Sequence, residues 1–103
     1  MKTIKLLRKH RKELKKLAKK TFDYDWMFLD KLVELKLRHM LEYYEKECTW
    51  LDNINKKKII QEISHVVDMY DAINDGSLDI IQDVEMYKQI YHYLAEHLQS
   101  WWD

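Results

Sequence analysis

Histidine and carboxylate side chains at helical spacing are the first candidates for chemistry in this sequence. Carboxylate di-metal sites in helical bundles use two Glu-x-x-His pairs and two further glutamates. The sequence holds one such pair, Glu62 with His65, and His92 lies one helical turn before Glu96. A metal-dependent hydrolase built on these four residues is one alternative. It is weakened because Glu62 and His65 flank an apolar seam and no second Glu-x-x-His pair exists.

Nucleophilic catalysis finds less support. None of the serines Ser64, Ser77 and Ser100 sits in a turn of small residues, and Cys48 has no histidine near it in the sequence. Cys48, the only cysteine, cannot form an internal disulfide, and a thiol of this kind more often fills space than attacks a substrate. We therefore predict no catalytic residue, no metal ion and no cofactor.

Charge is distributed unevenly along the chain. Residues 1–20 carry ten Lys/Arg and one acid, Glu13, a net charge of +9. The remaining 83 residues carry 8 basic and 17 acidic side chains, a net charge of −9, so the formal charge of the whole chain is zero. Such a division indicates an interaction surface that attracts phosphates.

Specific residues can be assigned to an anionic ligand. If a nucleotide is bound, the phosphate contacts are predicted at Arg8, Arg11, Lys12 and Arg38, and the stacking contacts at Tyr24, Trp26 and Trp102. Trp101 and Trp102 point about 100° apart on a helix. One of them is therefore expected to be exposed or covered by another subunit.

Two other interpretations of the basic segment stay open. Its lysines can form a solvated face, or they can neutralise acids elsewhere, such as the aspartates between residues 68 and 83. Contact with a membrane is disfavoured because the apolar face of residues 4–18 lacks Trp and Phe.

Periodicity and capping signals predict four helices, over about 2–20, 25–47, 53–74 and 79–101. The second has apolar residues, including Trp26 and Leu29, on more than half of its circumference. Its solvent side is predicted from its polar residues, which are Asp30, Glu34, Arg38 and Glu42.

The last two helices carry apolar seams with 4-3 spacing. Gly76, the only glycine, is predicted to end the third helix, and Asp79 with Gln82 to form a capping box for the fourth. The seam of the third helix consists of Ile59, Ile63, Val66, Tyr70 and Ile73. The seam of the fourth consists of Ile80, Val84, Tyr87, Tyr91, Leu94, Leu98 and Trp101.

These elements define the predicted fold class as all-α. We expect a compact bundle of three long helices plus a basic amphipathic N-terminal helix. With 103 residues the chain is one domain, in which 1–21 is the basic helix and 22–103 is the bundle core. One glycine and no proline exclude sandwiches, barrels and Gly-rich phosphate loops. No apolar run approaches 18 residues, so a soluble protein of the cytoplasm is expected.

Three stretches together resemble small all-helical accessory proteins of tailed bacteriophages. They are the Asp-Tyr-Asp-Trp start at 23–26, the Asp-Met-Tyr-Asp run at 68–71 and the C-terminal Trp-Trp-Asp at 101–103. The resemblance covers about 22–103 and leaves out the basic helix.

The resemblance implies a setting and a mode of action. The setting is the cytoplasm of an infected bacterium. The action is non-enzymatic counter-defence, by stoichiometric binding of a host defence protein or by sequestration of a nucleotide second messenger. The alternative is nucleic-acid binding through the basic helix. We expect a homo-oligomer that does not bind membranes.

Overall fold

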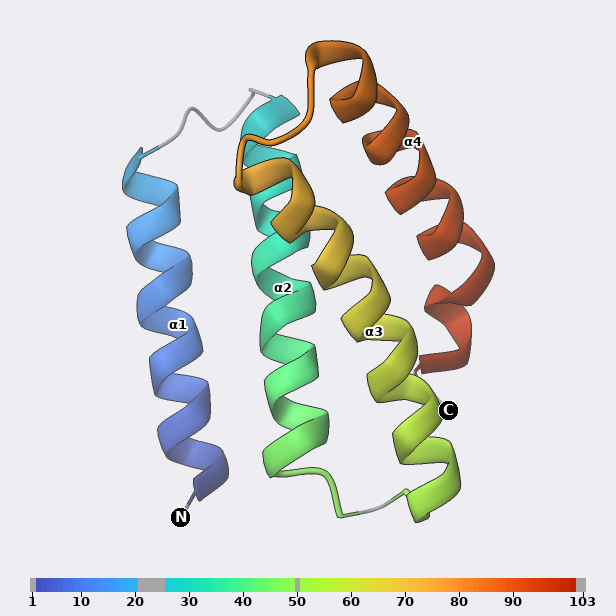
Figure 1. The fold of residues 1–103 in the computed structure, drawn as a ribbon. Helices are drawn as coiled ribbons and strands as arrows, with labels where there is room; N and C mark the ends of the chain where they lie inside the picture. The colour runs from blue at the N-terminus through green and yellow to red at the C-terminus, as the bar shows by residue number, and fades with distance from the viewer. Residues whose placement is uncertain (1, 21–25, 50, 102–103) are drawn as a thin grey trace. The chain divides into compact units, whose positions relative to one another are not determined.

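The computed structural model describes residues 2–20, 26–49 and 51–101, and every regular element in these ranges is a helix (Figure 1). The elements are α1 (Lys2–Lys20), α2 (Trp26–Lys46), α3 (Asn53–Asn74), α4 (Ile80–His97) and the short 3-10 helix η1 (Leu98–Trp101). The predicted all-helical class is therefore confirmed for the described ranges. The chain divides into two compact units, residues 1–52 and 53–103.

The first unit is an antiparallel pair of helices. α1 lies alongside α2 over most of its length, and the two helices run in opposite directions (Figure 1). The described part of the predicted basic segment, residues 2–20, is thus packed against α2. Leu37, Tyr44 and Cys48 are among the buried apolar residues of this unit.

The solvent side predicted for α2 was wrong. Asp30 is 3% exposed and Glu34 is 9% exposed. Glu34 borders a groove together with Glu13 of α1, and Glu42 contacts α1 directly. The polar side of α2 is partly covered because α1 packs across it. Conversely, the apolar residues of its first turn are exposed, namely Trp26, Met27 and Leu29.

The second unit pairs α3 with α4 and η1, again antiparallel (Figure 1). The predicted seam of α3 is buried at four positions, which are Ile59, Ile63, Val66 and Tyr70. The predicted seam of α4 was wrong at four positions, because Ile80, Val84, Tyr91 and Leu98 are exposed, whereas its members Leu94 and Trp101 are buried. At 100° per residue, the buried face is rotated toward Ile90, which lies outside the predicted seam and is fully buried.

The connection between α3 and α4 follows the predicted capping signals. Gly76 has a φ of 76°, in the left-handed region that glycine adopts without strain. Asp79 accepts a hydrogen bond from the Gln82 backbone N–H at 2.7 Å, and its own N–H donates to Gln82 Oε1 at 3.0 Å. The capping box predicted from the sequence is therefore confirmed.

Loss of this cap gives a testable change in stability. We expect Asp79→Ala to lower the free energy of unfolding by about 1 kcal/mol, because the Gln82 N–H at the start of α4 loses its carboxylate acceptor. Urea denaturation followed by circular dichroism measures the effect. Asp79→Ser retains a capping oxygen and should recover most of the loss; equal destabilisation by both variants would contradict this role.

None of the helices in the described ranges combines the length and the apolar character needed to cross a membrane.

Candidate functional site

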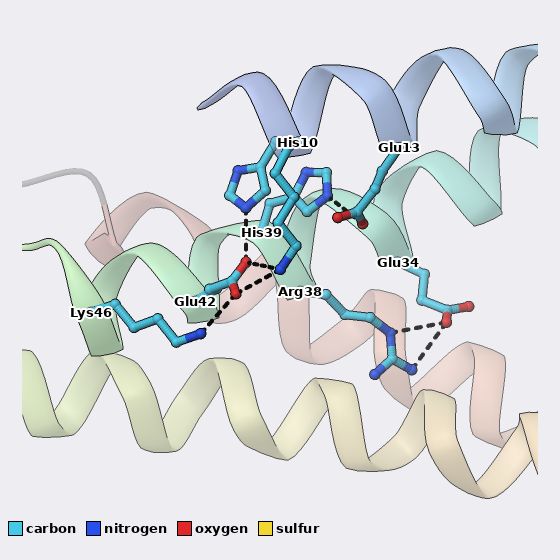
Figure 2. A network of polar contacts seen from close by, with 8 residues as sticks. His10, Glu13, Glu34, Arg38, His39, Glu42 and Lys46 are labelled. Atoms are coloured by element: carbon cyan, nitrogen blue, oxygen red, sulfur yellow. Dashed lines mark hydrogen bonds and ion pairs between the residues drawn. The ribbon is translucent and has the colours of Figure 1, made fainter. Parts of the chain in front are cut away.

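The helices of the first unit are joined by two copies of the same short pattern, His-x-x-Glu. One copy, His10 and Glu13, lies on α1, and the other, His39 and Glu42, lies on α2. Three-residue spacing places each histidine and glutamate on one face of its helix. Figure 2 shows that the two faces meet in a crosswise network, in which each histidine reaches the glutamate of the other helix.

The two histidine rings form the centre of this network, which we call the histidine pair. The rings of His10 and His39 are stacked, with centroids 3.8 Å apart and planes inclined by 5°. His10 Nε2 lies 3.0 Å from Glu42 Oε1, and His39 Nε2 lies 3.2 Å from Glu13 Oε2. The rings are 9% and 5% exposed, so the pair is a buried polar contact between α1 and α2.

Burial favours the neutral form of the His39 ring. Desolvation lowers the pKa of His39 below its ordinary value, and the hydrogen bond to Glu13 only partly opposes this effect. The positive charges of His10 and Lys36 lower the pKa further. Within the described part of the chain, His39 Nδ1 is buried and has no hydrogen-bond partner. A neutral ring leaves an acceptor unpaired there, whereas a protonated ring would leave a charged donor unpaired, which costs more.

The surroundings of Glu42, in contrast, favour its charged form. Its carboxylate accepts hydrogen bonds from Lys9 and Lys46, each at 2.9 Å, and contacts His10 (Figure 2). These contacts, with His10 the largest, lower the pKa of Glu42 to about 2. The stability that Glu42 contributes is therefore complete above its ordinary value of 4.5 and is lost as the pH falls through about 2.

Double protonation of the histidine pair is unfavourable. Two unit charges about 4 Å apart near a protein surface repel each other by about 4 kcal/mol. Glu13 and Glu42 offset part of this repulsion, while Lys9 and Lys46 add positive charge close to Glu42. The packing of α1 on α2 therefore disfavours a positive charge on both rings at once.

A groove between α1 and α2 lies next to this network. Its lining mixes three cations, two carboxylates and two leucines, and its volume is about 260 Å³, slightly below the usual range for small-molecule pockets. Arg38 lies in this groove and donates to Glu34 Oε2 from Nε at 3.2 Å and from Nη2 at 3.0 Å (Figure 2). The lining residues are Glu13, Lys16, Leu17, Lys31, Glu34, Leu35 and Arg38.

The basic face of α1 is the second feature of the site. A shallow hollow of about 430 Å³ runs along it, and its lining, which includes Arg8 and Lys12, comes entirely from α1. Six cations of this helix are exposed and have no ion pair or hydrogen bond with any residue in the described ranges. We call them the free cations; they are Arg8, Arg11, Lys12, Lys15, Lys16 and Lys19.

The predicted ligand residues are thus only partly brought together. Arg8, Arg11 and Lys12 share the exposed face of α1, whereas Arg38 lies in the groove and is paired with Glu34. Trp26 is 63% exposed at the start of α2. Tyr24 and Trp102 lie outside the described residues, so the stacking platform predicted from three aromatic residues is represented by Trp26 alone.

The residues considered for a metal site do not assemble. Among the residues that the structure describes, no group of three or more His, Cys, Asp or Glu side chains is placed to hold a metal ion. Glu62 accepts a hydrogen bond from the Trp101 indole at 2.9 Å, and the His65 ring packs against Tyr93. His92 and Glu96 form an exposed ion pair at 2.7 Å.

The histidine pair was not predicted from the sequence. The order Glu-x-x-His is the one typical of di-metal sites, whereas His10–Glu13 and His39–Glu42 carry the reverse order. The repetition of one pattern on two successive helices was the available signal. Antiparallel packing then decides whether two such faces meet.

Comparisons with known proteins add no family to this description. A scan of protein-family models gave no match, and searches of the curated proteins and of the solved structures gave none either.

Proposed function

We propose that this chain is a non-enzymatic binding protein that holds an anionic partner on the basic face of α1. The observation that carries the proposal is the set of six free cations on that helix. Charges used for internal stability are paired, as Lys9 and Lys46 are with Glu42. Unpaired cations concentrated on one helix face repel each other and are best explained by a ligand that neutralises them.

The proposed setting follows the phage-type resemblance of residues 22–103. There the chain would act in the cytoplasm of an infected bacterium as a counter-defence protein. It would bind a host defence protein through an acidic surface, or sequester a nucleotide signal. We further propose that all four helices form a single bundle and that the protein is a homo-oligomer.

Nucleic acid is the second candidate, and the arrangement of the cations favours it. Arg8, Lys12, Lys15 and Lys19 follow one another at spacings of 4, 3 and 4 residues. At 1.5 Å per residue this is a straight stripe about 16 Å long. A linear phosphate backbone can contact such a stripe at every step, whereas a compact nucleotide reaches only part of it.

Titration calorimetry distinguishes these partners. The panel consists of cyclic nucleotides, linear nucleotides and a single-stranded oligonucleotide, each at several salt concentrations. If all six free cations engage a single strand, the logarithm of the binding constant should fall with that of salt at a slope of about −4. Tighter binding of one nucleotide with a shallow slope supports sequestration. Absence of binding to every anion would contradict the use of this face for nucleotides or nucleic acid.

A further inference from the structure

The histidine pair occupies the contact that holds α1 to α2. His10 comes from α1 and His39 from α2, and each ring lies against the other and against a carboxylate of the opposite helix (Figure 2). Both rings are almost fully buried. Any change in the charge of these rings therefore acts directly on the packing of the two helices.

We propose that the histidine pair is a proton-operated latch, in which neutral or singly protonated rings hold α1 against α2 and protonation of both rings releases α1. The latch depends on the contact between the two histidine rings and not on a ligand of α1. It operates whether or not the basic face of α1 binds an anion, so its failure and the failure of the proposed function are separate results.

The charged groups around the pair determine how it responds. From α1 it is faced by Lys9 and Glu13, and from α2 by Lys36, Glu42 and Lys46. The two carboxylates stabilise the first proton. With both rings charged, the two positive charges lie on rings whose centroids are 3.8 Å apart, and the nearby lysines add to the repulsion. The buried Nδ1 of His39 offers that proton no acceptor.

The pH range of release follows from the direction of the shifts. The pKa of His39 is lowered in the packed state, and a released His39 regains its ordinary value of 6.5. Because the released state then binds more protons, release is favoured as the pH falls below 6.5. Glu42 stays ionised throughout, since its pKa is about 2. Between pH 6.5 and 4.5, His39 is thus the group whose protonation drives the change.

Hydrogen exchange of the full-length chain tests the latch. Protection factors, corrected for the intrinsic exchange rate at each pH, are compared at pH 7.5 and pH 5.5. We expect α1 amides to lose protection by up to about tenfold, because pH 5.5 lies one unit below the ordinary pKa of 6.5 that a released His39 regains, while α3 amides change little. His39→Gln retains an amide that can donate to Glu13 but cannot become a cation, and should abolish the loss. His92→Gln, at an exposed histidine, is the matched control and should behave like the original protein.

Proton NMR of the imidazole Cε1–H groups gives a second readout that needs no variant. We expect His39 to titrate below its ordinary value of 6.5. The proposal is overturned if α1 protection is the same at both pH values or if His39→Gln retains the full pH effect. It is equally overturned if His39 titrates as an isolated histidine near 6.5.

Discussion

Replacing Arg8, Lys12 and Lys15 together with glutamine is expected to weaken binding of a single-stranded oligonucleotide by about 100-fold. The three side chains belong to the central stripe of the free cations, and none of them takes part in the histidine pair. At about 1 kcal/mol for each exposed charged contact, three lost contacts give roughly this factor. The salt slope should also become shallower by about 2. Fluorescence anisotropy with a labelled oligonucleotide measures both quantities.

The matched control removes the same charge elsewhere. Lys57, Lys58 and Lys88 are exposed on α3 and α4, and their replacement by glutamine changes the net charge equally. This variant should keep the affinity within about twofold at 0.15 M salt, because these lysines do not belong to the free cations of α1 and contribute only through screened long-range attraction. Equal losses in both variants would show that net charge alone matters, and the assignment to α1 would then be incorrect.

Replacing Trp101 with alanine is expected to lower the free energy of unfolding by about 3–5 kcal/mol. Trp101 is the largest side chain among those that are fully buried, at 0% exposure. Its indole Nε1–H also donates to Glu62 Oε1 at 2.9 Å. The variant therefore leaves a cavity and removes a hydrogen bond to a carboxylate. Chemical denaturation followed by circular dichroism measures the loss.

Two further variants separate the contributions. Trp101→Phe keeps most of the apolar volume and removes the N–H donor, so its cost should be smaller, about 1–3 kcal/mol. Trp26→Ala removes the same type of side chain at a position that is 63% exposed, and should cost less than about 1 kcal/mol. A similar loss in the Trp26 and Trp101 variants would contradict the buried role of Trp101.

Local signals in the sequence were sufficient to predict the helices and their caps. The predicted range 53–74 coincides with α3, and the capping box of Asp79 and Gln82 is present. The left-handed conformation of Gly76 follows from its lack of a Cβ. Each of these features depends on residues within about one helical turn. Such contacts do not depend on how the helices pack against one another.

The faces of the helices were less predictable. A 4-3 seam on α4 predicted burial of Ile80 and Val84, which are 82% and 48% exposed. On α2, polar residues predicted a solvent side that includes the buried Glu34. Hydrophobic periodicity assumes that each helix buries its apolar side. α1 instead packs on polar residues of α2, because paired charges and stacked histidines satisfy one another there.

The sequence by itself determined that the described chain is helical, that its third helix spans 53–74, and that residues 1–20 carry a net charge of +9. The fourth helix, predicted over 79–101, ends at His97 and continues as the 3-10 helix η1. Only the tertiary structure decided that His10 and His39 stack and that each histidine contacts the glutamate of the other helix. The physical reason is range. Capping and helix formation involve neighbours along the chain, whereas the charge state of a buried histidine depends on groups about 30 residues away that packing alone brings within 4 Å.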